Sequence, residues 1–205
     1  MKKIAENSKN FYNGCLSKHG KSAKGLNWKN KQTQFLRFKI LSRIGKINNH
    51  SIHDFGCGFG DLFTLLKKDH NSFDYIGTDI SQEMISIARQ KHKSKNFFVF
   101  DLINSNFQSS FVKDYVISSG VFTVKNEISN GLWLKYLFKG VEKMFNYSRL
   151  GIGFNLMTSE VDFKDKNLFY IDPITIIKFL EKNISSKVKI INSYNLWEYT
   201  VFVYK

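Results

Sequence analysis

A glycine-rich turn between two acidic residues is the part of the sequence best suited to chemistry. Residues 54–61 read Asp-Phe-Gly-Cys-Gly-Phe-Gly-Asp and overlap the end of a strand-like run at Ser51–Phe55. Glycines permit a tight turn and a close approach of the backbone to a ligand at the edge of an open α/β sheet. The third glycine of the dinucleotide-binding motif is missing, because Asp61 or Phe63 stands there. The carboxylates of Asp54 and Asp61 would repel a pyrophosphate but suit a cationic ligand.

Two further acids follow the next predicted strands. Asp79 ends the run that begins at Phe73, and Asp101 ends the run Phe97–Phe100. Because the carboxyl ends of parallel strands meet at one edge of a sheet, we expect these acids to lie near the glycine turn.

Strand-like and helix-like runs alternate along the chain, which predicts crossover units on a mostly parallel sheet. The last two strands have no helix between them, so we predict that they form an antiparallel hairpin. The sheet is then mixed and seven-stranded. The predicted strands are 51–55, 73–78, 97–100, 115–118, 150–154, 187–191 and 199–204, and the predicted helices are 32–44, 61–68, one that begins after Ser81, 132–145 and 173–183.

Length and composition favour one domain over residues 1–205. The 205 residues are 42% hydrophobic, and no run has the pattern of a secretory signal or a membrane span. We therefore expect a cytoplasmic protein without membrane insertion. The two cysteines, Cys15 and Cys57, have no redox or metal-binding spacing, and no histidine pattern indicates a metal. We expect Cys57 to serve packing and His53 to be a core histidine.

The net charge of +14 raises the possibility of nucleic-acid binding. Only four of the 31 basic residues are arginine, the residue that reads phosphate and guanine with a planar fork. The lysines are interpreted as scattered over the surface, so nucleic acid is a disfavoured partner.

Residues 1–30 have the least regular pattern. Gly14, Gly20 and Gly25 alternate with aromatic residues such as Tyr12 and Trp28. We expect short helix and loop here, with the segment acting as a lid or cap that excludes water and orients an acceptor rather than completing the core.

The glycine turn resembles motif I of the class I S-adenosylmethionine-dependent methyltransferases, and the resemblance continues over Phe35–Lys205. It implies a Rossmann-like three-layer α/β sandwich with strand order 3-2-1-4-5-7-6 and an antiparallel last strand. It also implies S-adenosyl-L-methionine as cofactor and S-adenosyl-L-homocysteine as product.

The same resemblance implies roles for individual residues. Asp79 is similar to the acid that binds the ribose hydroxyls, and Asp101 to the acid that receives the adenine amino group beside the backbone N–H of Leu102. Ser118 and Ser119 end the fourth strand, which faces the methionine part. The full set of expected cofactor residues is Asp54, Gly56, Cys57, Gly58, Gly60, Asp61, Asp79, Ile80, Met84, Asp101, Leu102, Ser118 and Ser119.

Motifs that are missing from the sequence narrow the range of possible methyl acceptors. The chain has Ser118-Ser119-Gly120-Val121-Phe122 where amino methyltransferases of DNA and protein amides have Asn/Asp-Pro-Pro-aromatic, and its one proline precedes no cysteine nucleophile. Short segments, among them Gly25–Trp28, look like those of small, mostly uncharacterised bacterial methyltransferases. We expect a small-molecule or saccharide acceptor; the alternatives are an RNA methyltransferase and a cofactor-binding member without catalysis.

Residues of the segments expected to cover the crevice are the candidates for chemistry and for acceptor binding. A general base is needed only if the acceptor must lose a proton. The candidate catalytic residues are Tyr12 and His19, the candidate substrate residues are Trp28, Arg37, Phe122, Asn155 and Tyr170, and Glu198 is a further polar candidate.

Overall fold

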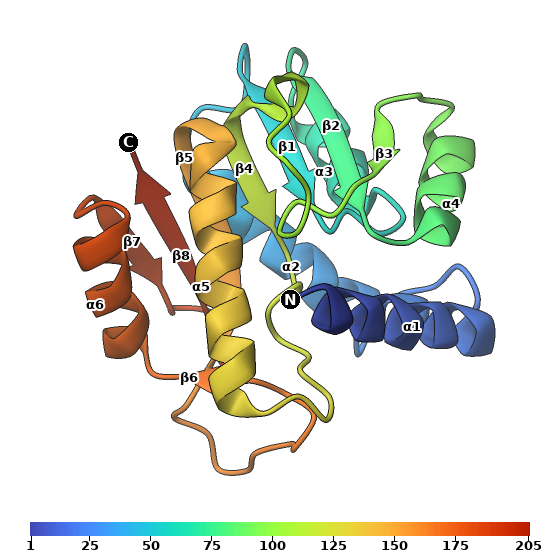
Figure 1. The fold of residues 1–205 in the computed structure, drawn as a ribbon. Coiled ribbons are helices and arrows are strands. Elements are labelled where there is room, and N and C mark those ends of the chain that lie inside the picture. Colours follow the sequence, from blue (N-terminus) through green and yellow to red (C-terminus); the bar gives the residue numbers. More distant parts are fainter.

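A computed structural model describes residues 1–205 as an eight-stranded sheet with helices on both faces (Figure 1). The strands are β1 Ser51–Phe55, β2 Asp74–Asp79, β3 Phe97–Val99, β4 Lys113–Ser118, β5 Ser148–Thr158, β6 Tyr170–Ile171, β7 Val188–Ile191 and β8 Glu198–Tyr204. The helices are α1 Lys2–His19, α2 Lys31–Leu41, α3 Asp61–Asp69, α4 Gln82–His92, α5 Asn130–Asn146 and α6 Pro173–Asn183. Three short 3₁₀ turns accompany them, η1 Lys24–Leu26, η2 Ser42–Ile44 and η3 Ser109–Phe111.

The order of the strands is β3-β2-β1-β4-β5-β8-β7. β1 to β5 are parallel, and β8 is antiparallel to both β5 and β7. This confirms the predicted mixed sheet and the order of its seven strands. The eighth strand, β6, was not predicted: it has two residues, which pair with Met157 and Thr158 at an extension of β5. A two-residue strand is too short to produce an alternating pattern.

Side-chain caps fix where several helices begin. The side chains of Asn30, Ser81, Ser129 and Asp172 each accept a hydrogen bond from a backbone N–H in the first turn of the helix that follows. Such caps satisfy donors that the helix itself leaves free.

The sheet separates two hydrophobic clusters. One contains the buried faces of α5 and α6 together with Ile4 of α1, and the other contains those of α2, α3 and α4. The parallel strands are covered on both sides, as their continuous hydrophobic sequences require. No helix combines the length and the apolar composition needed to cross a membrane.

The amino-terminal segment differs from its prediction. Residues 2–19 form one continuous 18-residue helix, and Ile4 and Ala5 are buried, so the segment does contribute to the core. Gly14 lies inside this helix with open space around it, and Gly20 ends it at a φ of 63°. The helix was missed because polar residues interrupt its apolar positions. Figure 1 shows α1 crossing the carboxyl edge of the sheet from α5 toward α4.

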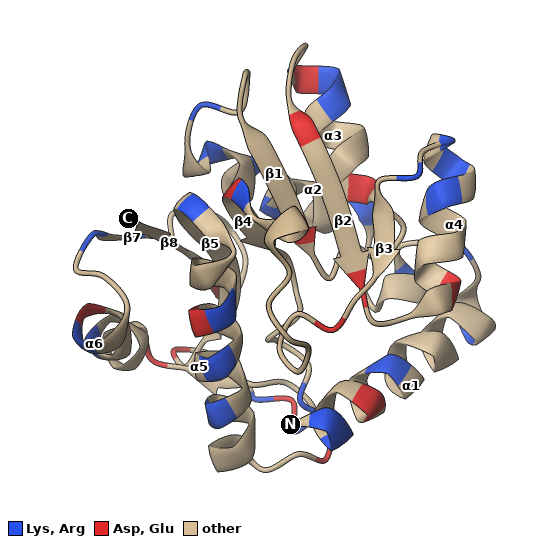
Figure 2. Ribbon diagram, turned by 45° about the horizontal axis from the view of Figure 1, so that its top comes forward, with Lys and Arg blue, Asp and Glu red and all other residues tan.

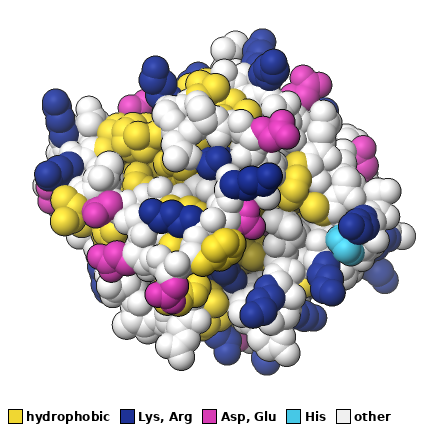
Figure 3. Space-filling model, turned by 90° about the horizontal axis from the view of Figure 1, so that it is seen from below, with side chains coloured by type: hydrophobic (Ala, Val, Ile, Leu, Met, Phe, Trp, Pro, Cys, Tyr) yellow, Lys and Arg dark blue, Asp and Glu magenta, His cyan; other side chains and the backbone are white.

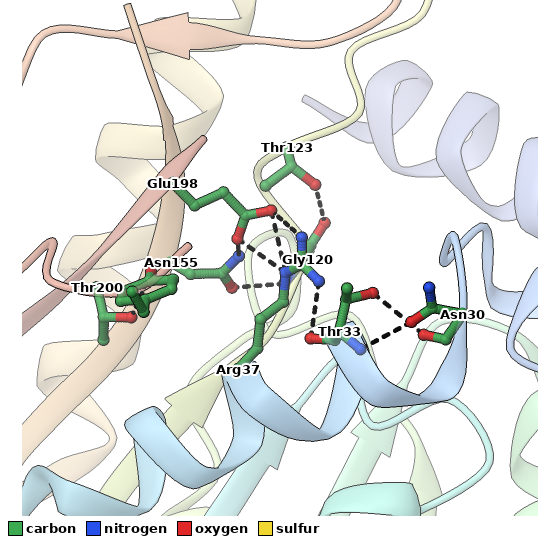
Figure 4. Close-up of polar contacts among 9 residues, drawn as sticks. Asn30, Thr33, Arg37, Gly120, Thr123, Asn155, Glu198 and Thr200 are labelled. Carbon is green, nitrogen blue, oxygen red and sulfur yellow. Dashed lines mark hydrogen bonds and ion pairs between the residues drawn. The ribbon is translucent and has the colours of Figure 1, made fainter. Parts of the chain in front are cut away.

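A buried ion pair joins the second helix, α2, to the last strand, β8 (Figure 4). The Arg37 Nε donates to both carboxylate oxygens of Glu198, at 3.0 and 2.8 Å, and Nη2 adds a further contact. Asn155 on β5 donates to Glu198 at 2.6 Å and accepts from the Gly120 N–H at 2.9 Å. The network therefore connects α2, β5, β8 and the loop after β4.

The network leads to a prediction about stability. Glu198→Ala leaves the Arg37 guanidinium buried without a carboxylate, and we expect a loss of about 3–5 kcal/mol of unfolding free energy in urea titrations. Replacing both residues with leucine should cost less than the single change, because no uncompensated charge remains.

The matched control is the surface pair Lys113–Asp74, in which the Asp74 side chain is 56% exposed. Asp74→Ala should cost less than about 1 kcal/mol. Equal losses for Glu198→Ala and Asp74→Ala would contradict a structural role of the buried pair.

Candidate active site

The glycine turn after β1 leads the chain into α3 at the carboxyl edge of the sheet. Gly56, Gly58 and Gly60 all have positive φ, between 51° and 75°, a region that favours glycine. The N–H groups of Gly56 and Cys57 donate to the Thr78 carbonyl on β2 at 2.8 and 3.0 Å. A Cβ on Gly56 would lie 2.2 Å from the Val121 side chain, so the loop after β4 packs directly on the turn.

Beside this turn lies a largely apolar cavity at the carboxyl ends of β1, β2 and β4. The space within its walls and open mouth is about 930 Å³. The helices α1, α2, α4 and α5 contribute to its wall. The predicted residues that line it are Tyr12, Trp28, Asp54, Gly56, Cys57, Gly58, Asp79, Ile80, Met84, Asp101 and Ser119.

Asp54 is a buried carboxyl group on the floor of the cavity. Its Oδ2 accepts a hydrogen bond from the Tyr75 hydroxyl at 2.6 Å. Burial is the main cause that raises the pKa of Asp54 to about 7. The hydrogen bond from Tyr75 opposes this increase, and the nearby charge of Asp79 contributes to it. The group can therefore change its charge near neutral pH, and a positively charged ligand would favour its ionised form.

Asp79 is held in place by the backbone around it. Its Oδ2 accepts from the Gly58 N–H at 3.0 Å, and its Oδ1 accepts from the Ser81 N–H at 2.9 Å. Burial raises the pKa of Asp79, and these backbone bonds oppose the effect. Each oxygen retains a lone pair that can accept from a ligand hydroxyl.

Asp101 forms a tight turn after β3. Its carboxylate accepts from the backbone N–H groups of Ile103 and Asn104, at 3.1 and 3.0 Å, and from the Asn104 side chain at 2.7 Å. Leu102 is fully buried and does not line the cavity. Its backbone N–H has no acceptor within the protein.

Two tyrosines from different helices lie close to these acids. Burial raises the pKa of both phenols. The negative charges of Asp101 and Asp79 raise the pKa of Tyr136 further, and the charge of Asp79 does the same for Tyr12. Tyr12 therefore keeps its proton at neutral pH and serves as a donor rather than as a base. The adjacent Asn13 accepts a hydrogen bond from the Ser81 hydroxyl at 2.7 Å, so α1 covers the Asp79 side of the cavity.

The opposite end of the cavity is formed by the loop after β4 and by the segment before α2. The hydroxyls of Ser118 and Ser119 are buried without a hydrogen-bond partner, and Ser119 lines the cavity. The Trp28 ring lies against Gly120, where a Cβ would be 2.6 Å from the indole. The Arg37 guanidinium stacks on the same ring, 4.6 Å from its centroid, so the ion pair holds Trp28 in the wall.

Several predicted residues lie outside the cavity. His19 is exposed near the end of α1, because α1 places residues 8, 9 and 12 toward the cavity instead. Gly60 packs against His92 and Phe97, and Asp61 binds Lys91 and Gln34. Buried Ser118 does not line the cavity.

Four predicted substrate residues are occupied elsewhere. Arg37 and Asn155 bind the predicted polar candidate Glu198, so none of the three is free for an acceptor. Phe122 is buried in the core against Phe55 and Phe154. Tyr170 accepts from the Asp165 N–H within its own loop. The structure thus places these four side chains outside the lining of the cavity, since sequence alone does not give the partners that bury a side chain.

The cavity also contains residues that were not predicted, namely Ser8, Lys9, Leu26, Gln34, Phe38, Phe55, Ser81, Gly120, Val121 and Tyr136. Ser8 and Lys9 lie on the same face of α1 as Tyr12, at helical spacing. This pattern could be used only if residues 2–19 had been recognised as a helix. Tyr136 follows the same buried periodicity as Trp133 and Leu137, so it was indistinguishable from core.

Two buried groups behave as predicted. Burial raises the pKa of the Cys57 thiol well above its usual range, which agrees with a packing role. His53 bonds the Phe111 carbonyl and the Thr78 hydroxyl, and burial lowers its pKa to about 3, so it is a neutral core histidine. No cluster of His, Cys, Asp or Glu is arranged to hold a metal ion.

Sequence comparisons agree with this geometry. The family described as "Methyltransferase domain" matches residues 52–132, which include the glycine turn and the three cavity acids. "Putative methyltransferase Rv1506c" of Mycobacterium tuberculosis is 29% identical over 161 residues, covering 76% of this chain and 93% of that protein. Demethylmenaquinone methyltransferase of Thermotoga maritima is 31% identical over 71 residues, which are 35% of this chain and 31% of that protein.

Solved structures share the fold at low sequence identity. Magnesium protoporphyrin IX methyltransferase from Synechocystis PCC 6803, crystallised with bound SAM, superposes with a TM-score of 0.68 at 15% identity, covering 98% of this chain and 97% of that one. The [4+2]-cyclase SpnF superposes with a TM-score of 0.65 at 14% identity, covering 92% and 75%. The fold by itself thus occurs with more than one activity. The methyltransferase domain matched over residues 52–132 thus contains the glycine turn and the three cavity acids, and the chain as a whole shares the fold of these solved structures.

Proposed function

We propose that the cavity binds S-adenosylmethionine and that the protein transfers its methyl group to a small-molecule or saccharide acceptor. The observation that carries the proposal is the meeting of Asp54, Asp79 and Asp101 in one largely apolar cavity beside the glycine turn. Carboxylates suit the hydroxyl, amino and cationic groups of this cofactor, and apolar walls suit its ring. We further propose that residues 1–205 act as one domain with the amino-terminal segment as its cap.

The donors and acceptors on the walls fit the parts of the cofactor. Asp79 would bind the ribose hydroxyls, and Asp101 would bind the adenine edge, with Ile80 and Met84 beside the ring. Asp54 and the Ser119 hydroxyl, which lacks a partner, would serve the methionine part.

The cofactor supplies an activated methyl group, so the protein mainly has to orient two reactants and exclude water. Such positioning can contribute about 7–11 kcal/mol to catalysis. The ion pair of Arg37 and Glu198 holds Trp28 against Gly120, and α1 covers the cavity from the other side. Because Tyr12 stays protonated, we infer that no Tyr12 phenolate base takes part. An acceptor that must lose a proton on methylation would then release it to water, while the sulfonium becomes the neutral thioether of S-adenosylhomocysteine.

The lining of the cavity favours a small acceptor. Small-molecule sites are concave and mostly apolar, with a few placed polar groups, and this cavity has such walls. Trp28, Phe38 and Val121 form the walls around the space beside Ser119. Flat or half-apolar molecules, including sugars, fit such walls.

The first test is binding of the cofactor. S-adenosylmethionine and S-adenosylhomocysteine should raise the melting temperature, whereas NAD should not, since the turn lacks the dinucleotide pattern. Asp79→Ala should weaken S-adenosylhomocysteine binding about 10- to 150-fold by calorimetry, the scale of hydrogen bonds to a charged group. Asp162→Ala, an exposed loop acid, is the control. Unchanged affinity in Asp79→Ala would place the ligand elsewhere.

The raised pKa of Asp54 predicts a pH dependence. Below pH 7 the carboxyl group is largely protonated and neutral, and it ionises as the pH rises through about 7. S-adenosylmethionine carries a sulfonium charge that S-adenosylhomocysteine lacks. The ratio of their affinities should therefore increase about two- to fourfold in favour of S-adenosylmethionine between about pH 6 and pH 7.5. Asp54→Asn should show a constant ratio; an identical increase in this variant would rule out Asp54 as the cause.

The position of α1 revises the predicted role of the amino-terminal segment. Since Tyr12 lies beside Asp79, we expect Tyr12→Ala to weaken S-adenosylhomocysteine binding about 5- to 30-fold through lost apolar contact. His19→Ala, on the same helix but exposed, should leave the affinity within about twofold of the wild type. If Tyr12→Ala keeps cofactor affinity and loses only turnover, α1 serves the acceptor instead.

A further inference from the structure

The positive charge of the protein is concentrated at its amino-terminal end. Residues 1–46 contain 12 of the 31 Lys and Arg residues but only one of the 17 Asp and Glu residues. The other 19 basic residues are spread over residues 47–205 together with 16 acidic residues. α1 carries Lys2, Lys3, Lys9 and Lys18 together with Glu6, and Figure 2 shows its basic segments with one acidic segment between them. The face in Figure 3 carries many Lys and Arg side chains beside several Asp and Glu side chains. These elements border the cavity mouth.

A second cavity lies within this basic region. It is formed by the α1–α2 connection, the amino end of α3 and the outer side of α4. Three lysines line it, Lys21, Lys31 and Lys91, and its one acid is Asp61. Asp61 already accepts hydrogen bonds from Lys91 and from the Gln34 side chain, so its charge is compensated.

Two of the three lysines have no carboxylate partner. Lys21 donates to the neutral side chain of Gln90 at 3.0 Å, and Lys31 lies 5.4 Å from the centre of the Phe35 ring. The four ion pairs of the protein include neither. The cavity thus has a net positive charge without an internal anion to balance it, which favours an anionic ligand.

The two cavities share a wall. Gln34 on α2 lines both, and its amide group bonds Asp61 on the far side. A molecule that reaches from the Trp28 end of the first cavity past Gln34 would therefore meet Lys31 and Lys21. Flexible lysines hold a phosphate as point charges, and a phosphate monoester carries a charge close to −2 at neutral pH.

We propose that the second cavity binds a phosphate group of the methyl acceptor. The acceptor is then a small phosphorylated molecule, such as a sugar phosphate, whose methylated part lies in the first cavity. That the ligand is the methyl acceptor rests on the proposed function. The phosphate site itself is inferred from the two lysines that have no carboxylate partner.

The test uses inorganic phosphate as probe and calorimetry on the full chain. Lys21→Met with Lys31→Met should weaken phosphate binding at least about tenfold, because two unpaired charges are removed. The control, Lys2→Met with Lys3→Met, removes the same charge from exposed positions on α1 and should leave phosphate affinity within about twofold. S-adenosylhomocysteine affinity should be unchanged in both double variants.

The other outcomes are decisive in the same experiment. Equal phosphate affinity in the two double variants would overturn the site, whether both fall or neither does. A third outcome is that the protein binds no phosphate but binds a single-stranded RNA oligonucleotide, and that both double variants weaken the RNA binding equally. This outcome would replace the phosphate site with a nucleic-acid surface. Phosphate binding by a protein that binds no S-adenosylhomocysteine would refute the proposed function while leaving the phosphate site in place.

Discussion

The buried pair of Arg37 and Glu198 constrains most of what surrounds the cavity. Glu198 begins the last strand and Arg37 belongs to the second helix, so the pair joins distant ends of the chain. Through Asn155 it also holds the Gly120 amide, and through stacking it holds Trp28. Because both charges are desolvated, such a pair contributes little net stability. The loss of either partner is nevertheless costly, so the two side chains must stay in contact. The partners of this pair therefore determine where the loop after β4 and the segment before α2 can lie.

The three acids of the cavity are held together at a cost that a ligand can offset. Asp54 is buried and Asp79 is half-buried. In addition to the effect of burial, the charge of Asp79 raises the pKa of Asp54 while that of Asp54 raises the pKa of Tyr75. Tyr75 and the backbone N–H groups of Gly58 and Ser81 supply partial compensation. Functional sites commonly keep groups in such perturbed states. A cationic, hydroxyl-rich ligand would complete the compensation.

The sequence was sufficient for the sheet and for the binding edge, because both depend on local patterns. Alternating runs predicted the seven strands and their order, and the glycine turn with Asp79 predicted where the cavity lies. The acceptor side was less predictable, since Arg37 and Asn155 were recognised as polar but not as partners of Glu198. Tyr136 was hidden by core periodicity, and α1 by its polar composition. Each failure concerns a contact between segments far apart in the chain.

The Ser81 hydroxyl makes the start of α4 independent of its contact with α1. It caps α4 by accepting from the Met84 N–H, while its single proton can go to Asn13 of α1 at 2.7 Å or to Glu83 at 3.0 Å. Without Asn13, the proton still has an acceptor in Glu83, so no buried donor is left without a partner. A substitution at Asn13 therefore removes a contact of α1 without removing the cap of α4.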